Sequence, residues 1–152
     1  MSKIIIHGGF FSESSTNIET KIAKQQALLR IVKDSYAYLQ NHSALETVVY
    51  AVSQLEDDEL FNAGIGSQIQ SDGKIRMSAS LMDGESQKMS GVINIEEVKN
   101  PIQVAQVLMQ VDDRILGGSG ATNFARKHGF ESFSTEIPQR RAEYEAKLAS
   151  LG

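Results

Sequence analysis

The sequence contains few residues of the types that form metal centres or activated nucleophiles. Cysteine is absent, which excludes disulfides, zinc–thiolate sites, iron–sulfur clusters and cysteine nucleophiles within this chain. The three histidines, His7, His42 and His128, lie at the predicted ends of a strand and of two helices. We expect them to bond to the backbone or to favour a helix dipole rather than to bind a metal ion.

Two further segments have compositions that occur in ion-binding or phosphate-binding loops. The acidic run over residues 56–59 lacks the alternating ligands and the terminal glutamate of an EF-hand calcium loop, so we expect a solvated loop. The glycine-rich run over residues 116–122 lacks both the Gly-Lys-Ser/Thr ending of a phosphate loop and the spacing of a dinucleotide fingerprint. Its small residues instead predict close packing of a helix on a strand.

Length and composition predict one compact domain. The chain has 152 residues, a formal net charge of -4 and 41% hydrophobic residues, enough for a packed core. A sequence pI near 5.4 argues against a dedicated nucleic-acid binder, because phosphate contacts need a basic face. No run of about 18 apolar residues is present, and the isoleucines over residues 4–6 are too short a run for a signal peptide. We therefore expect a soluble, cytoplasmic protein that does not bind membranes.

The helical spacing of apolar residues predicts five helices. Two begin at capping boxes over residues 16–19 and 43–46. A third begins at Asn100 and Pro101, residue types that favour the N-cap and the first helical position, and Gly129 suits the C-terminal end of a fourth. The predicted helices cover residues 16–41, 43–55, 101–109, 119–128 and 138–148.

The remaining apolar runs predict strands and one shaped loop. Strands are expected over residues 3–6, 67–70, 74–82, 89–95 and 114–116, with a hairpin turn at Asp72-Gly73. Residues 56–66 show neither the helical nor the strand spacing of apolar residues. They also contain Gly64 and Gly66, which can adopt positive φ, so we expect a loop there. A buried strand at residues 3–6 needs paired neighbours, so a second copy or another polypeptide is expected to complete the sheet.

Five short motifs become informative in combination. They are residues 7–9 (His-Gly-Gly), 55–67 (Leu-Glu-Asp-Asp-Glu-Leu-Phe-Asn-Ala-Gly-Ile-Gly-Ser), 82–84 (Met-Asp-Gly), 100–102 (Asn-Pro-Ile) and 120–125 (Gly-Ala-Thr-Asn-Phe-Ala). With these motifs in this order, the chain resembles the N-terminal half of the plant-type asparaginase and isoaspartyl peptidase family of N-terminal nucleophile hydrolases. The resemblance covers residues 3 to about 130, and the longest motif is the most specific.

The resemblance implies an α/β (α+β) fold, a four-layer αββα sandwich assembled from an α and a β subunit. Members of the family cut their own precursor before a threonine, and residues 1–152 correspond to the α subunit, usually found in an (αβ)₂ particle. Gly152 is the residue type expected just before the scissile bond, and residues 130–152 are the expected linker to it. The nucleophile is therefore expected on the β subunit.

The resemblance also implies the chemistry and its residues. An N-terminal threonine combines a hydroxyl nucleophile with an α-amine of pKa about 7.7–8.0 that can act as base. The implied small-molecule substrates are L-asparagine and isoaspartyl (β-aspartyl) dipeptides. Asn62 is expected beside the nucleophile, and Gly8 and Gly9 are expected in a loop against the active site. From residue types alone, Asn62 could equally hold a glycine-rich loop, and the two glycines could form only a tight turn.

A structural sodium ion is the other implied component, and no cofactor is expected for the chemistry itself. Backbone carbonyls would surround the ion and hold Asn62 in place, because hard cations prefer oxygen ligands. The carbonyls carried over from the family belong to Leu55, Glu56, Asp58, Phe61, Ala63 and Ile65.

Four positions depart from the family pattern and keep two alternatives open. Phe10 and Phe11 add bulk after the His-Gly-Gly motif, and Ser78 and Ser119 stand where acidic residues are common. These departures give weight to a non-catalytic binding or regulatory domain that keeps the fold. A glycosylasparaginase-like amidase is the other alternative, although the cysteines of its secreted forms are absent here.

Overall fold

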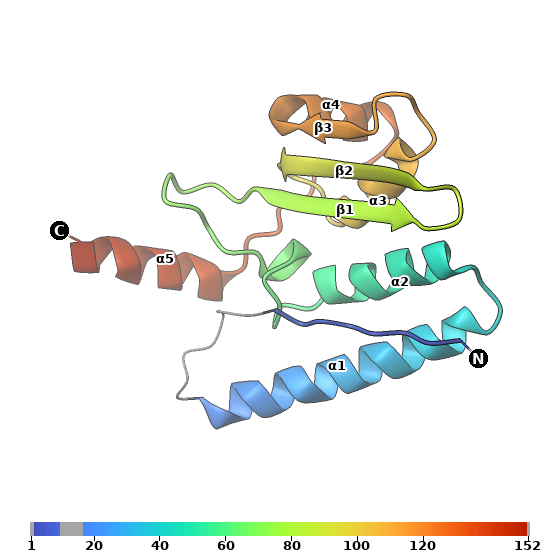
Figure 1. The fold of residues 1–152 in the computed structure, drawn as a ribbon. Coiled ribbons are helices and arrows are strands. Elements are labelled where there is room, and N and C mark those ends of the chain that lie inside the picture. Colours follow the sequence, from blue (N-terminus) through green and yellow to red (C-terminus); the bar gives the residue numbers. More distant parts are fainter. Residues whose placement is uncertain (1, 10–16, 152) are drawn as a thin grey trace.

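The computed structural model describes residues 2–9 and 17–151, and for Leu151 the backbone alone. The described residues form five α-helices, a short 3-10 helix and a three-stranded sheet (Figure 1). The elements are α1 (Ile18–Leu39), α2 (Ala44–Glu56), η1 (Gly64–Gly66), β1 (Met77–Asp83), β2 (Lys88–Ile95), α3 (Pro101–Leu108), β3 (Ile115–Gly117), α4 (Gly118–Lys127) and α5 (Pro138–Leu151). None of the described helices is long and apolar enough to cross a membrane. The fold is mixed α/β, and the five predicted helices are confirmed.

The sheet has one buried face and one open face. Its strand order is β1-β2-β3, with β1 antiparallel to β2 and β2 parallel to β3. Leu81 lies opposite Ser90, and the next pair along the strands joins Met82 to Met89. Because side chains alternate along a strand, the two pairs lie on opposite faces. Leu81 and Ser90 are buried, whereas Met82 and Met89 are exposed.

Helices α3 and α4 cover the buried face of the sheet (Figure 1). Val92 of β2 packs with Val104 of α3 and Ala121 of α4 in one core cluster. A second cluster joins Val49 of α2 to Ile102 of α3 and to strand β1. Most of the core therefore lies between the helices and this one face of the sheet.

Helices α1 and α2 pack against each other, and residues 2–9 run along them (Figure 1). Ile31 of α1 and Phe61 form a third cluster, against which Ile6 packs. The prediction of a strand at residues 3–6 is wrong for the described chain, because this segment belongs to no sheet there and Ile5 is 95% exposed. A strand requires a neighbour for its backbone groups, and β1, β2 and β3 provide none.

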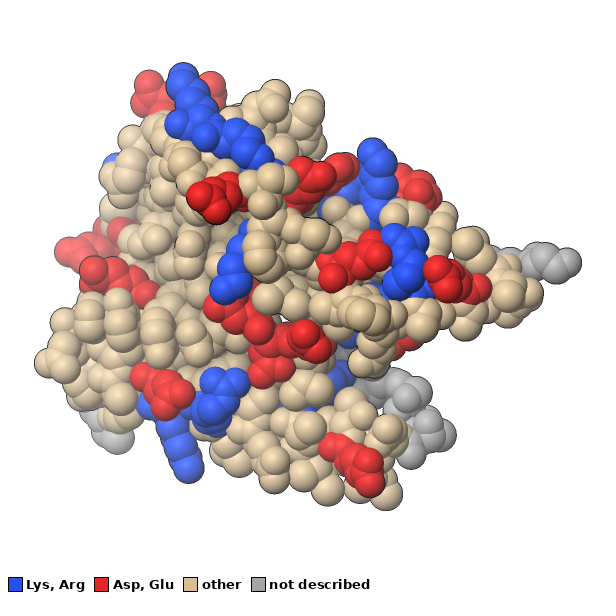
Figure 2. Space-filling model, turned by 180° about the vertical axis from the view of Figure 1, so that it is seen from behind, with Lys and Arg blue, Asp and Glu red and all other residues tan. Residues whose placement is uncertain are grey.

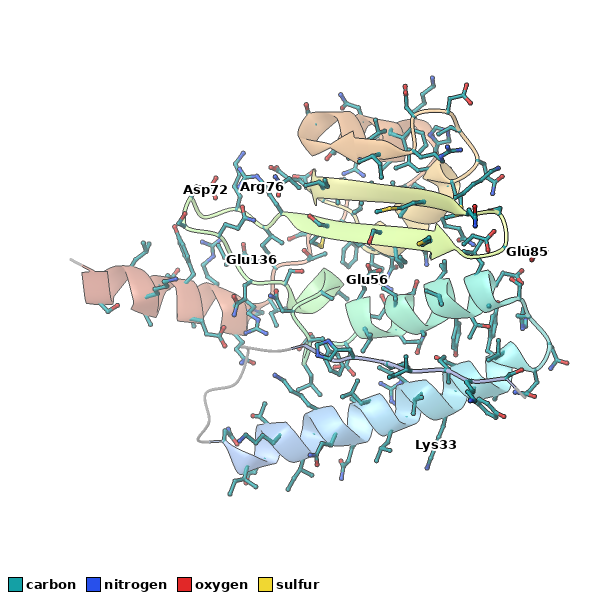
Figure 3. The ribbon with its side chains drawn as sticks, in the orientation of Figure 1. Lys33, Glu56, Asp72, Arg76, Glu85 and Glu136 are labelled. Atoms are coloured by element: carbon teal, nitrogen blue, oxygen red, sulfur yellow. The ribbon has the colours of Figure 1, made fainter. Side chains whose placement is uncertain are left out.

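The predicted hairpin over residues 67–82 is a second correction. Residues 71–73 do form a tight turn, in which the Gln70 N–H donates to the Lys74 carbonyl at 2.8 Å. Residues 67–70 nevertheless form no strand, and the observed hairpin joins β1 to β2. The Arg76 guanidinium holds the turn instead, bonding Asp72 at 2.8 Å and Glu96 at 2.9 Å (Figure 3).

Local chemistry explains where the helices begin and end. Ser43 and Glu46 form the predicted capping box of α2, each side chain accepting the other residue's backbone N–H. Helix α1 is capped by Asn17, whereas the predicted cap Thr16 lies outside the described residues. Gly129 has a φ of +84°, the left-handed conformation that suits the end of α4.

Two of the histidines, His42 and His128, bond to helix carbonyls. The Nδ1 atoms of His42 and His128 lie 2.9 Å from the carbonyl oxygens of Tyr38 and Phe124. Each imidazole also stacks on the aromatic ring of the same partner residue. Within residues 2–9 and 17–151, no three or more acidic or histidine side chains are grouped so that they could hold a metal ion.

Candidate functional site

The candidate site is built on residues 56–68, which leave the C-terminal end of α2. The chain folds back through backbone hydrogen bonds from Asp58 N–H to Leu55 O at 3.4 Å and from Phe61 N–H to Asp58 O at 3.2 Å. The Asp58 carboxylate accepts a third hydrogen bond, from Leu60 N–H at 3.1 Å. The predicted loop is thus a closed, hydrogen-bonded structure, and η1 forms its last turn.

Two glycines allow this loop to fold tightly. A Cβ atom on Gly64 would lie 2.1 Å from the carbonyl oxygen of Glu56, and one on Gly66 would lie 1.9 Å from that of Phe61. Gly64 also has a φ of +51°, which larger residues disfavour. Of these two glycines, only Gly64 therefore has the predicted positive φ. At position 66 a glycine is needed because the Phe61 carbonyl leaves no room for a Cβ atom.

Asn62 lies exposed on this loop. Its Oδ1 atom accepts a hydrogen bond from the backbone N–H of Gln68 at 2.9 Å, which fixes the orientation of the amide plane. The side chain therefore holds the loop, as residue types alone suggest. Its Nδ2 group still has two N–H donors that can bind a substrate or another chain.

The structure brings Gly8 next to this loop. A Cβ atom on Gly8 would lie 2.9 Å from the ring of Phe61 and 2.7 Å from the side chain of Leu28. The absence of a side chain thus lets the N-terminal segment pack directly on the residue before Asn62. Gly9 has a φ of +93°, so the backbone turns at a conformation that favours glycine. The predicted Gly8 and Asn62 sites are therefore neighbours.

Other residues singled out by sequence lie elsewhere. Gly152, Phe10 and Phe11 are outside the described residues. Ser78 is exposed on β1, where its hydroxyl accepts a hydrogen bond from a backbone N–H of β2 at 3.2 Å. Ser119 is exposed in the first turn of α4.

Glu56, the last residue of α2, places a buried carboxyl beside the loop (Figure 3). It is 4% exposed, and its Oε1 atom accepts a hydrogen bond from the Ile102 N–H at 3.1 Å, in the first turn of α3. The Oε2 atom is buried without a hydrogen-bond partner among the described residues. Burial raises the pKa of Glu56 to about 8, and the hydrogen bond from the Ile102 N–H opposes this shift. The buried carboxyl therefore holds its proton more tightly than an exposed glutamate does.

The ligands that this loop could offer a cation are backbone carbonyl oxygens. The carbonyl oxygens of Asp58 and Ala63 each accept one backbone N–H group, at 3.2 and 3.1 Å, and keep a second lone pair, whereas the Leu55 carbonyl accepts the N–H groups of both Asp57 and Asp58. The contact of Gly64 with the Glu56 carbonyl brings the two ends of the loop together. Uncharged oxygens on one closed loop are ligands that hard cations accept.

Arg140 of α5 binds the same loop, and sequence analysis did not identify it. Its Nε donates to the carbonyl oxygen of Gly66 at 2.9 Å, and its Nη1 pairs with Glu143 at 2.7 Å. Arg140 is only 9% exposed. The segment predicted as a linker thus contributes a buried contact to the loop of Asn62. Its position on a charged helix gives no sign of a partner 74 residues away.

Comparisons with known proteins agree on one family. A family model described as Asparaginase matches residues 1–149. The chain is 49% identical over 127 residues to the isoaspartyl peptidase/L-asparaginase of Synechocystis sp., covering 82% of this chain and 38% of that protein. It is 43% identical to the Nostoc sp. protein of the same name, covering 93% and 45%. The plant-type L-asparaginase of Pyrococcus furiosus is 39% identical, with coverages of 95% and 47%.

The lengths of these matches also bear on whether this chain corresponds to a whole relative or to part of one. The chain spans about half the length, or less, of the curated relatives it matches. This share is consistent with one subunit that needs its partner half. The match over nearly the whole chain agrees with the ordered motifs, and this chain therefore belongs to the asparaginase family that includes plant-type asparaginases and isoaspartyl peptidases.

Proposed function

We propose that this chain is the α subunit of a self-processed threonine hydrolase that acts on L-asparagine and isoaspartyl dipeptides. The observation that carries the proposal is the contact between Gly8 and Phe61, which unites the His-Gly-Gly segment with the Asn62 loop. Relatives named isoaspartyl peptidase/L-asparaginase support the substrate class. The nucleophilic threonine lies on the other half, the β subunit.

The open face of the sheet supports a partner half. Its large apolar side chains come from all three strands and are about half exposed or more: Met82 68%, Met89 52%, Ile93 52% and Ile115 50%. Packed sheets interdigitate such side chains across about 10 Å. A β-subunit sheet on this face, with a further helical layer, gives the four-layer αββα sandwich. A β-subunit strand beside residues 3–6 would also satisfy their backbone groups.

The proposed reaction uses both functional groups of the threonine. Its hydroxyl oxygen attacks the side-chain amide carbonyl of the substrate while its α-amine accepts the hydroxyl proton. The carbon–nitrogen bond then breaks, and the proton passes to the leaving nitrogen, which departs as ammonia or as the amine of the released amino acid. Water hydrolyses the remaining ester and releases aspartate. Asn62, with its Oδ1 held by Gln68, presents its N–H donors to the threonine.

Maturation uses the same hydroxyl in this proposal. Before cleavage the oxygen attacks the carbonyl carbon of Gly152, and the peptide nitrogen leaves as the new α-amine. Water then hydrolyses the resulting ester. A glycine at this position tolerates the backbone strain that such an attack requires.

A structural sodium ion is the proposed ligand of the loop. The close approach of Gly64 to the Glu56 carbonyl supports this assignment, because it brings the backbone between Ala63 and Ile65 close to the start of the loop. The ion would hold the loop that carries Asn62 and would not take part in bond breaking. The six carbonyls assigned to it belong to Leu55, Glu56, Asp58, Phe61, Ala63 and Ile65.

An activity assay of the complete protein tests the proposed substrates. We expect ammonia from L-asparagine and free aspartate from β-aspartyl dipeptides, but no product from α-aspartyl dipeptides. Replacing the threonine after Gly152 with alanine should abolish both cleavage and hydrolysis. A cleaved protein that hydrolyses neither substrate contradicts the substrate assignment. An uncleaved protein without activity supports the non-catalytic binding domain instead.

A further inference from the structure

Helix α5 has one buried side chain, and that side chain is charged. Within residues 138–150, Arg140 is the one buried residue, and Arg141 and Tyr144 are half-buried. Figure 2 shows α5 as a projection at the right of the molecule, with both basic and acidic side chains on its visible surface. An apolar face therefore does not hold α5 against the rest of the chain.

Polar contacts hold α5 instead. The Nε of Arg140 donates to the Gly66 carbonyl at 2.9 Å, and the hydroxyl of Tyr144, one turn further along, donates to the Ser71 carbonyl at 3.4 Å. The Glu143 carboxylate accepts from the Nη1 of Arg140 at 2.7 Å. Burial of a guanidinium costs free energy unless its donors are bonded. These bonds therefore keep Arg140 in a single orientation, aimed at the loop.

The peptide group that Arg140 bonds is held on both sides. It joins Gly66 to Ser67, and while its carbonyl oxygen accepts from Arg140, its N–H donates to the Gly64 carbonyl at 3.2 Å. Gly66 has no side chain that could restrain this peptide group by packing. The guanidinium thus supplies, from outside the loop, a contact that fixes the peptide plane.

The next peptide group along the chain orients Asn62. It joins Ser67 to Gln68, and its N–H donates to the Asn62 Oδ1 at 2.9 Å. Residues 67–70 belong to no helix or strand, so the position of this N–H depends on the peptide groups beside it. A shift of the peptide group that Arg140 holds would therefore move the donor and turn the Asn62 amide.

We propose that Arg140 is a positioning residue, which fixes the Asn62 amide through the backbone of residues 66–68 and so aligns the nucleophilic threonine. This inference rests on the proposed function, in which the N–H donors of Asn62 reach the threonine. Helix α5 then remains a functional part of the enzyme after the chain is cut, rather than only a linker to the cut site. A misplacement of about 1 Å near the reacting groups can lower turnover about a hundredfold, so one such contact is enough to matter.

Steady-state kinetics of the cleaved protein test this role. Arg140→Met keeps much of the side-chain volume and removes the donor to Gly66. We expect kcat on L-asparagine to fall about tenfold while KM stays within about twofold, because the threonine is misaligned but substrate binding is unchanged. Arg141→Met is the matched control, since Arg141 forms a partly exposed ion pair with Glu136 and should keep the wild-type kcat. Equal kcat in the two variants overturns the proposal.

A double-mutant cycle separates positioning from a general loss of stability. Because Arg140 acts through Asn62 in this proposal, Arg140→Met should lower the turnover of an Asn62→Ala protein by less than about twofold. Circular dichroism should be the same for all four proteins of the cycle. A loss of the same factor in both backgrounds would show that Arg140 does not act through Asn62, which overturns the proposal.

Hydrogen exchange gives a readout that depends neither on hydrolysis nor on self-cleavage. The reference is the Phe61 N–H, which donates to the Asp58 carbonyl near the start of the loop at 3.2 Å. Relative to this reference, the Gln68 N–H should exchange about tenfold faster in Arg140→Met than in the wild type. Equal acceleration at both positions overturns the proposal. A protein that hydrolyses neither substrate but shows the selective acceleration at Gln68 keeps the positioning contact and refutes only the proposed function.

Discussion

The Nε atom of Arg140 donates a hydrogen bond to the carbonyl oxygen of Gly66 at 2.9 Å, joining α5 to the loop that carries Asn62. The bond lies where the loop is tightest, because Gly66 itself lies against the carbonyl of Phe61. The buried Arg140 guanidinium thus fixes the loop near Gly66, away from the point at which the loop leaves α2. The geometry of the candidate site therefore depends on a contact between segments far apart in sequence.

Arg140→Met should destabilise the complete protein by about 1.5–3 kcal/mol, the usual contribution of a hydrogen bond to a charged group. Methionine keeps much of the side-chain volume and removes the donors. Arg141→Met is the control, because Arg141 forms an ion pair with Glu136 that is more than a third exposed on both sides. Denaturant unfolding should separate the two variants, and equal small losses would contradict a structural role for Arg140.

Gly66→Ala should distort the loop, because its new Cβ would meet the Phe61 carbonyl at 1.9 Å. We expect a loss of about 1–3 kcal/mol in unfolding free energy and at least a tenfold loss of turnover. Gly120→Ala is the matched control, since a Cβ at Gly120 contacts nothing within 4 Å and alanine favours helix α4. Retained turnover in Gly66→Ala would show that the loop shape is not needed.

Glu56 should make stability fall as the pH rises. Its folded-state pKa, raised by burial to about 8, lies above the ordinary glutamate value of 4.5, so the folded protein binds the proton more tightly than the unfolded chain. The stabilising contribution is complete below pH 4.5 and is lost as the pH passes through about 8. Glu56→Gln keeps the hydrogen bond from Ile102 and cannot ionise, so we expect it to remove this dependence.

The pH profile of Glu56→Gln must be read as a difference from the wild type. Asp83 and Glu136 give the opposite slope only as the pH falls below about 4.5, because hydrogen bonds from Ser86 and Arg141 lower the pKa of each carboxyl. Their contribution is the same in both proteins and cancels. Chemical unfolding between pH 5 and pH 9 provides the measurement, and parallel curves for the two proteins would refute the prediction.

Asn62→Ala should lower turnover at least tenfold while the protein stays folded and cleaved. The side chain is exposed, and its internal bond to Gln68 contributes only about 1 kcal/mol. Asn62→Asp keeps the acceptor and removes the N–H donors, so it should lose a similar factor. Steady-state assays on L-asparagine give the result, and unchanged turnover in both variants would remove Asn62 from the site.

Local chemistry in the sequence predicts much of this fold. The five helices follow from apolar spacing and from caps such as Ser43 and Gly129, which act within a few residues. Strands are harder to predict from the sequence, because each depends on a neighbouring strand for its backbone hydrogen bonds. Residues 3–6 have the composition of a buried strand, yet no described strand lies beside them. The turn at residues 71–73 was also predicted to lie in a strand hairpin. There the ion pairs of Arg76, rather than a second strand, hold the chain.

The sequence predicts only those residues of the candidate site that lie together in one contiguous motif. Asn62 and its loop follow from such a motif, whereas Arg140 reaches the loop through tertiary packing and leaves no local signal. Glu56 offered a weak signal. It follows Val49 by seven residues and Ser53 by three, so it lies on the buried side of α2. An acidic residue on such a side indicates a buried carboxyl. The prediction that Glu56 belongs to a solvated acidic loop is therefore wrong, because Glu56 ends α2 and is 4% exposed.

A denaturing intact-mass spectrum of the complete gene product tests the central claim most directly. We expect two chains, one ending at Gly152 with a mass near 16.7 kDa and a second beginning with threonine. The variant with alanine in place of that threonine should give a single uncut chain. A wild-type protein that remains one uncut chain, or is cut elsewhere, would contradict the account of a self-processed threonine hydrolase.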